Sequence, residues 1–166
     1  MAPEKITDPT TRCRLVLCMG PADIANYNAD ALAEILAAGD VASLIVYSDG
    51  SDESAFQRSI ESLVPVAQSA GIATIVVEDT QTAGRLGVDG LQLGQDPVAL
   101  RDAIDRFSPQ MMVGAGNVKT RHNALVLGEL QPDYLMFGKP GGDTRPEPHP
   151  KNLALGQWWS TIVEIP

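Results

Sequence analysis

Leu44-Ile45-Val46 and Thr74-Ile75-Val76-Val77 are two unbroken apolar runs of strand length. A strand with one face in water alternates apolar and polar side chains, whereas a parallel strand covered on both faces reads as a continuous apolar run. The two runs are therefore predicted to be strands of a parallel sheet that is buried on both sides.

Strand-length apolar segments alternate with helix-length segments along the rest of the chain. The six predicted strands are Arg14–Met19, Ala42–Tyr47, Ala73–Val77, Gly90–Leu93, Met111–Ala115 and Tyr134–Gly138. The predicted helices are Asn28–Ala38, Ser54–Ala70, Ala99–Phe107, Lys119–Leu130 and Asn152–Val163. Consecutive strand–helix units form parallel sheets with right-handed crossovers. The pattern fits both a (β/α)₈ barrel and an open doubly wound sheet, and periodicity does not separate them.

The composition is that of one globular α/β domain, residues 1–166, without a surface for nucleic acid or membranes. Hydrophobic residues make up 44% of the chain, and the formal net charge is −9. Nucleic acids and anionic membranes require a basic stripe, which this sequence lacks. Met1–Arg14 has no apolar run typical of a signal peptide, and no stretch approaches the ~20 apolar residues of a membrane span. We therefore predict a cytoplasmic protein.

The two cysteines, Cys13 and Cys18, are predicted to be free thiols. On one extended strand, five steps place them ~16 Å apart and on opposite faces, whereas a disulfide allows at most ~7 Å between the α-carbons. A nicotinamide-binding fold would require GxGxxG after its first strand, but residues 18–23 read Cys-Met-Gly-Pro-Ala-Asp. Trp158 and Trp159 are adjacent and cannot share one helix face, so one of them is predicted to pack inward.

Three motifs resemble those of the thiamine-phosphate synthase / TenI family. Residues 87–96, Gly-Val-Asp-Gly-Leu-Gln-Leu-Gly-Gln-Asp, are similar to its "GADGVHLGQED" signature. Residues 132–138, Pro-Asp-Tyr-Leu-Met-Phe-Gly, resemble its "ADYVGFG" strand, and Val113-Gly114-Ala115-Gly116 followed by Lys119-Thr120 resembles "IGVSVHT". The motifs occur in the family's order. The resemblance implies a (β/α)₈ barrel, of which this chain contains about six βα units.

The resemblance also implies a chemistry and a partner, a small phosphorylated heterocycle. Family synthases join hydroxymethylpyrimidine pyrophosphate to thiazole phosphate with Mg²⁺ and release pyrophosphate. TenI-like relatives share the fold without that activity, and some isomerise the thiazole. Both functions, a synthase and a TenI-like isomerase or ligand-binding module, remain alternatives for this chain.

Several family positions are altered. The synthase motif Q-x-R-x-K, which holds pyrophosphate, falls on Val46, Ser48 and Gly50. Because a charge-assisted hydrogen bond contributes ~1.5–3 kcal/mol, the loss of two cations favours the TenI-like alternative. The family's metal-binding residues fall on Glu78 and on Pro97, which replaces an Asp, while Asp96 stands at the motif's preceding Glu. Glu78 and Asp96 are the candidate Mg²⁺ ligands. Asp96 is followed by a proline, a pattern also typical of a helix start.

The resemblance places the remaining candidate residues in strand-end loops. The family's Ser after the fifth strand falls on Gly116 or Asn117, depending on a one-residue gap, and its His aligns with Lys119. Asn117 and Lys119 are the candidate catalytic residues. An exposed lysine at a helix start is the alternative interpretation of Lys119. Substrate and phosphate binding is predicted for Ser48, Gln92, Gly138, Lys139, Thr144 and Arg145. Arginine suits this role because its planar fork matches phosphate oxygens.

The chain ends at Ile165-Pro166, where the family's seventh strand begins. We therefore expect the last two βα units to be missing from this chain. A six-stranded barrel has two unpaired sheet edges, and such edges favour pairing with another chain. A homo-oligomer is accordingly a possible form.

Overall fold

The computed structural model describes residues 13–50, 52–142 and 145–166, which form a parallel sheet surrounded by helices. The strands are β1 (Leu15–Met19), β2 (Val41–Val46), β3 (Ala73–Val77), β4 (Gly90–Leu93), β5 (Met112–Val118) and β6 (Tyr134–Phe137). Their order in the sheet is their order in the chain, and every neighbouring pair is parallel.

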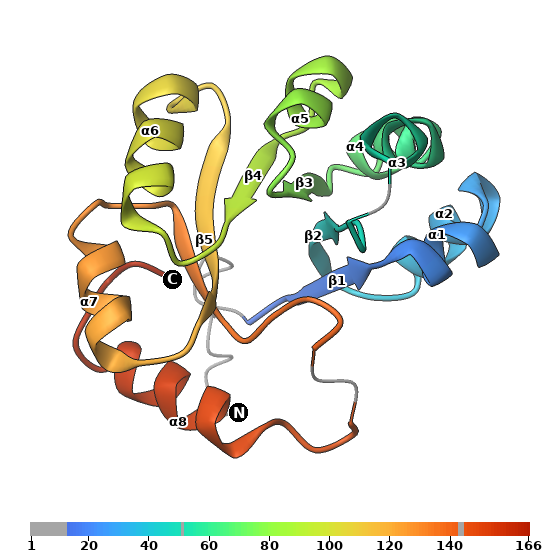
Figure 1. The fold of residues 1–166 in the computed structure, drawn as a ribbon. Helices are drawn as coiled ribbons and strands as arrows, with labels where there is room; N and C mark the ends of the chain where they lie inside the picture. The colour runs from blue at the N-terminus through green and yellow to red at the C-terminus, as the bar shows by residue number, and fades with distance from the viewer. Residues whose placement is uncertain (1–12, 51, 143–144) are drawn as a thin grey trace, which may run out of the picture.

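The helices lie on the outer side of the curled sheet (Figure 1). They are α1 (Pro21–Asn26), α2 (Ala29–Ala37), α3 (Glu53–Ile60), α4 (Val64–Ser69), α5 (Thr80–Leu86), α6 (Pro97–Phe107), α7 (Arg121–Gly128) and α8 (Pro150–Trp159). A doubly wound sheet reverses its strand order and has helices on both faces. The sequential order and the single helical layer therefore select the barrel type, as the family resemblance implies.

The core lies between the sheet and the outer helices. Leu44, Val76 and Leu91, from three successive strands, are fully buried in it. Their sequence neighbours Ile45 and Ile75 line the inner side of the sheet instead. Burial on both sides explains the unbroken apolar runs, and the strands predicted from them are confirmed.

One helix prediction was wrong in detail, and two short helices were not predicted. The segment predicted as one helix, Ser54–Ala70, forms α3 and α4, which are separated by a turn at residues 61–63. Pro65 is the reason, because proline has no N–H to donate to the carbonyl four residues earlier. The helices α1 and α5 were not predicted, since both are short and α5 has few apolar residues.

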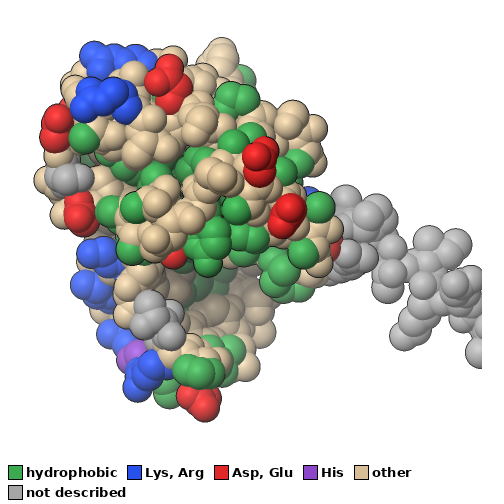
Figure 2. Space-filling view, turned by 90° about the vertical axis from the view of Figure 1, so that its right-hand side faces the viewer, with side chains coloured by type: hydrophobic (Ala, Val, Ile, Leu, Met, Phe, Trp, Pro, Cys, Tyr) green, Lys and Arg blue, Asp and Glu red, His purple; other side chains and the backbone are tan. Residues whose placement is uncertain are grey.

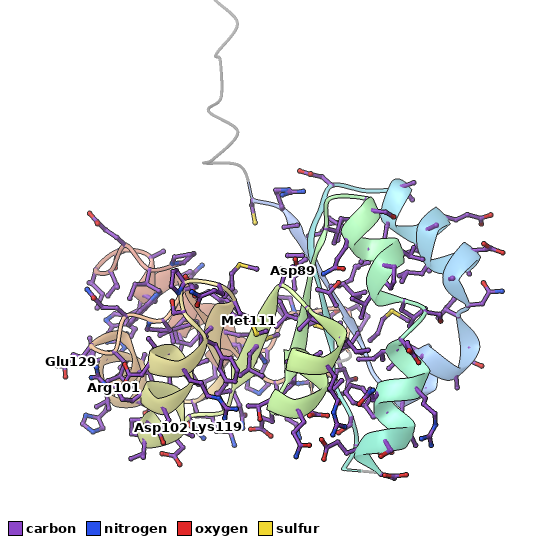
Figure 3. All side chains as sticks on the ribbon, turned by 90° about the horizontal axis from the view of Figure 1, so that it is seen from above. Asp89, Arg101, Asp102, Met111, Lys119 and Glu129 are labelled. Carbon is purple, nitrogen blue, oxygen red and sulfur yellow. The ribbon has the colours of Figure 1, made fainter. Side chains whose placement is uncertain are left out.

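Two aspartates that precede strands connect neighbouring strands of the sheet. The carboxylate of Asp89, which is labelled in Figure 3, accepts from the N–H of Thr74 at 2.8 Å and from Gln68 Nε2 at 3.2 Å. Asp133 repeats the arrangement two strands later, where it accepts from the N–H of Val113 at 2.7 Å. Both aspartates belong to the family motifs, and their role here is to join β3 to β4 and β5 to β6.

The curled sheet is open between β1 and β6. The edge strand β1 exposes Leu15 and Val16 by 55% and 51%, and Figure 2 shows the surface hollowed, with hydrophobic side chains beside the hollow. At the other edge, Leu135 N donates to the carbonyl of Pro166 at 2.8 Å. The last residue of the chain thus lies alongside β6. None of the described helices is long and apolar enough to cross a membrane.

Candidate functional site

A pocket of about 390 Å³ lies at the carboxyl ends of the strands. This is the edge at which α/β barrels carry their active sites. Strands and loops far apart in the sequence meet there. Its lining residues are Tyr47, Ser48, Asp49, Gly50, Val77, Glu78, Asp79, Gln92, Leu93, Gly94, Gly116, Asn117, Lys139 and Pro140.

The structure brings five of the predicted site residues into this pocket, namely Ser48, Glu78, Gln92, Asn117 and Lys139. Lys119, Arg145, Gly138 and Asp96, which the structure also describes, are not among the lining residues. Lys119, labelled in Figure 3, is exposed on the loop before α7. Arg145 is exposed on the β6–α8 loop, and Thr144 lies outside the described residues.

Gly138 and Asp96 have structural roles. Gly138, at φ +109°, accepts through its carbonyl from the N–H of Asn117 at 2.7 Å and so connects the ends of β5 and β6. The carboxylate of Asp96 accepts from the N–H of Val98 at 2.9 Å and caps α6. Asp96 therefore marks a helix start, as its following proline indicated.

Two pocket residues have left-handed backbone conformations, which residues other than glycine seldom adopt. Glu78 directly follows β3 and has φ +58°, and Asn117 has φ +59° within β5. Such conformations cost ~1–3 kcal/mol and gather at binding and active sites. Oε1 of Glu78 lies above Gly94, where an added Cβ would approach it to 2.8 Å. The strained turn and the missing Cβ together give the Glu78 carboxylate its place in the pocket.

Gln92 forms the buried floor of the pocket. It is 1% exposed, and its Oε1 accepts from the hydroxyl of Tyr134 at 3.1 Å. Gln92, Gly114 and Tyr134 pair in register on β4, β5 and β6. The Tyr134 ring passes over Gly114, where an added Cβ would lie 2.2 Å from the ring. Gly116 lies in the same way beneath the Gln92 amide. The two glycines of the Val113–Gly116 motif therefore make room for the Tyr134 ring and for the Gln92 amide.

Tyr47 connects the end of β2 to the loop after β6. Its hydroxyl end lies against Gly20 on one side and Gly141 on the other, where an added Cβ would come within 2.6 Å and 2.2 Å of it. Burial, and next the negative charge of Asp23, raise the pKa of the Tyr47 phenol, which therefore stays protonated. The contact with Gly141 holds the loop that carries Lys139 at the pocket. Tyr47 was not among the predicted site residues.

For the phosphorylated ligand that the family resemblance implies, the Gly141→Ala variant should bind about threefold to tenfold more weakly, because a displaced loop moves a cationic hydrogen-bond donor. Gly71→Ala is the matched control. Both glycines have positive φ, +69° and +71°, but nothing lies within 4 Å of a Cβ at Gly71. Calorimetric titration with thiamine phosphate measures the difference. Equal affinities for the two variants would show that the Tyr47 contact does not position the loop.

Carboxylates outnumber cations around the pocket, but not all are available to a ligand. Asp79 caps α5 by accepting from the N–H of Thr82 at 2.8 Å. Glu78 has no recorded capping bond in the described part of the chain. Within the same residues, no group of three or more His, Cys, Asp and Glu side chains is arranged to hold a metal ion. A cation at this site would therefore need ligand oxygens in addition to Glu78.

Two predictions outside the pocket are also confirmed. Cys13 and Cys18 are free thiols. Trp159 is the tryptophan that packs inward, at 3% exposure, while Trp158 is half-buried beneath the guanidinium of Arg121.

Comparison with known proteins gives consistent results. The thiamine monophosphate synthase (TMP-TENI) family model matches residues 15–166. A thiamine-phosphate synthase of Rhodospirillum centenum is 34% identical over 94% of this chain and 76% of its own length. One from Hyphomonas neptunium is 32% identical over 95% of this chain and 74% of its own length.

A solved structure supports the fold. The thiamine phosphate pyrophosphorylase of Pyrococcus furiosus superposes with a TM-score of 0.69 at 17% sequence identity, covering 91% of this chain and 71% of that one. At this identity the likeness concerns the fold alone. The family model and the two curated relatives carry the assignment: this chain belongs to the thiamine monophosphate synthase (TMP-TENI) family.

Proposed function

We propose that the chain binds the phosphorylated pyrimidine and thiazole precursors of thiamine at this pocket and couples them with release of pyrophosphate. The observation that carries the proposal is the meeting of Lys139, Glu78 and Gln92 in one pocket at the carboxyl edge of the sheet. An ammonium suits phosphate oxygens, and a buried amide suits a heterocycle. Membership of the family supports the class of reaction. A cytoplasmic location belongs to the same proposal.

Coupling forms a bond between the thiazole ring nitrogen and the pyrimidine's methylene carbon and breaks the bond from that carbon to pyrophosphate, so negative charge grows on the leaving oxygen. Lys139 is the side chain that would stabilise this charge, because it lines the pocket from the loop after β6. Preorganised cations at developing charge are a large source of rate enhancement. Asn117, held in its left-handed conformation beside Gly138, adds a neutral polar group at the same edge.

Mg²⁺ fits this pocket through Glu78. The ion takes one or two carboxylates together with substrate phosphate oxygens, and Glu78 extends over the space left by Gly94. When bound, Mg²⁺ would neutralise pyrophosphate and make it a better leaving group. Asp96 caps α6 and is not among the pocket-lining residues. Glu78 and the substrate phosphates would therefore be the ligands of the metal.

A TenI-like protein without synthase activity is the second candidate. One observation favours it: Ser48, Asp49 and Gly50 line the pocket at the end of β2, and none of the three is a cation. The Q-x-R-x-K motif of the synthases falls on this stretch, so the pyrophosphate has lost its usual partners there.

The Lys139→Ala variant should form thiamine phosphate about 10- to 100-fold more slowly than the unsubstituted chain, because a hydrogen bond to a charged group contributes ~1.5–3 kcal/mol. The assay mixes the full chain with hydroxymethylpyrimidine pyrophosphate, thiazole phosphate and Mg²⁺, and measures thiamine phosphate. Lys151→Ala is the matched control, because Lys151 is exposed on α8 outside the pocket lining. Lys119→Ala tests the remaining catalytic prediction in the same assay.

Absence of turnover by the unsubstituted chain, beside an active synthase, would reject the coupling reaction. Calorimetric binding of thiazole phosphate that weakens in Lys139→Ala would then support the second candidate. Equal turnover by Lys139→Ala and Lys151→Ala would remove Lys139 from the mechanism.

A further inference from the structure

The buried floor of the pocket has a fixed polarity. Gln92 and Tyr134 are joined by the hydrogen bond from the phenol to Oε1, at 3.1 Å. Burial raises the pKa of Tyr134 far above its ordinary value, so the phenol keeps its proton. In the structure this phenol donates, and the oxygen of the amide accepts. The nitrogen end of the Gln92 side chain is then the end that remains for a ligand.

The surroundings hold the amide in this orientation. Nε2 and Cδ of Gln92 lie 2.4 Å and 2.8 Å from where a Cβ at Gly116 would be, so the amide rests directly on the backbone of β5. The Tyr134 ring is held in turn by its close approach to Gly114. Among the described residues, the bond from Tyr134 is the one recorded for the Gln92 side chain. Gln92 and Gly116 both line the pocket, and Nε2 is the Gln92 atom that lies nearest to Gly116.

The two ends of the pocket differ in charge. At its floor, Gln92 is 1% exposed and has the apolar pocket residues Val77 and Leu93 as its neighbours in the lining. At its rim, Lys139 is exposed. Burial of an ionised group without a partner of opposite charge costs far more than burial of a neutral acceptor. A phosphate is therefore better placed at the rim, and a neutral acceptor atom at the floor.

We propose that Tyr134 is a positioning residue that orients Gln92 as a hydrogen-bond donor, and that the ligand presents an uncharged acceptor, a ring nitrogen or carbonyl oxygen, at the end remote from its phosphate. The inference rests on the proposed function and deepens it, because it determines which end of a phosphorylated heterocycle enters first. Tyr134 acts through Gln92 and has no contact with the ligand in this arrangement.

The test compares two probes on the full chain by calorimetric titration. Thiamine phosphate has ring nitrogens and a phosphate, whereas inorganic pyrophosphate has only charged acceptors. Gln92→Met should bind thiamine phosphate about tenfold more weakly and pyrophosphate unchanged, because an unsatisfied buried acceptor costs ~1–3 kcal/mol. Tyr134→Phe should lose about threefold to tenfold in affinity for thiamine phosphate, and its affinity for pyrophosphate should not change. Tyr27→Phe, at a site 43% exposed at the end of α1, is the control and should change neither affinity.

A spectroscopic measurement separates orientation from general damage. The side-chain amide signal of Gln92, identified by its absence from the Gln92→Met spectrum, should move when thiamine phosphate is added to the unsubstituted chain. In Tyr134→Phe the signal should already be shifted before the ligand is added. The inference is overturned if Gln92→Met binds thiamine phosphate with unchanged affinity, or if the amide signal does not move when the ligand is added. The proposed function stands in either case. Failure of the unsubstituted chain to bind thiamine phosphate also overturns the inference, whereas the proposed function is decided separately by the turnover assay.

Discussion

The Trp159→Ala variant should have a free energy of unfolding about 3–5 kcal/mol below that of the unsubstituted chain. Trp159 is 3% exposed, and its Nε1 donates to the carbonyl of Ile165 at 2.7 Å. Its ring packs edge-on against Phe137 at 6.1 Å and contacts Gly128, where an added Cβ would approach it to 2.7 Å. One side chain thus joins α8, β6, α7 and the end of the chain. Its removal leaves a large cavity and an unsatisfied carbonyl.

Trp158→Ala is the matched control because the two tryptophans are neighbours on α8 with the same side-chain volume. Trp158 is half-buried and stacks under the guanidinium of Arg121 at 5.0 Å. An exposed cation–π contact contributes ~0.5–1 kcal/mol, so the loss should be far smaller. Urea unfolding followed by circular dichroism measures both variants. Equal losses would mean that Trp159 does not anchor α8 in the way its contacts indicate.

The strands could be predicted from sequence because their signal is local. In β2 and β3, burial on both faces leaves no polar position in Leu44-Ile45-Val46 or Ile75-Val76-Val77. The helix break was also signalled, by Pro65, but the continuous apolar face from Phe56 to Ala67 favoured one helix. The unpredicted α5 has weaker signals, an Asp79 cap and a left-handed Gly87 at its end. Short helices of this kind are stabilised by packing more than by their own residues.

The site was only partly predictable because some prominent residues line the pocket, whereas others stabilise the fold. Candidate binding residues such as Lys139 and Gln92 indicate the pocket, and the structure places both there. The motif aspartates Asp89 and Asp133 are equally prominent in the sequence but bond to the backbone of neighbouring strands. Asp96 likewise caps a helix. A resemblance therefore identifies the positions, while contacts decide whether each one serves the fold or the ligand.

Contacts between distant segments had no signal in the sequence. Tyr47 meets Gly141 across the mouth of the barrel, and Tyr134 reaches over β5 to Gln92. In both cases a glycine on one segment makes room for an aromatic ring from another. The glycines of these motifs are thus best explained by their neighbours in space. Gly114, which faces the Tyr134 ring, gives the second large effect expected for this chain.

The Gly114→Ala variant should lose about 1–3 kcal/mol of unfolding free energy, as overpacked interiors do. The added Cβ would lie 2.2–2.6 Å from three ring atoms of Tyr134, and a planar ring cannot bend away as a flexible side-chain end can. Gly84→Ala is the control, because nothing lies within 4 Å of a Cβ at Gly84 in α5. An alanine in a helix is more favourable than glycine by ~0.8–1 kcal/mol, so this control should be slightly more stable.

A double-mutant cycle shows whether the ring is the cause. Tyr134→Ala will itself be destabilising, since it removes a large ring and its bond to Gln92. In that background Gly114→Ala should cost close to nothing, because the atoms that the new methyl group meets are gone. Contacting residues show coupling energies of ~0.5–3 kcal/mol, whereas independent sites add. If the cost of Gly114→Ala is the same with and without the Tyr134 ring, the glycine serves β5 itself, and the support of the pocket floor by Gly114 and Tyr134 must be abandoned.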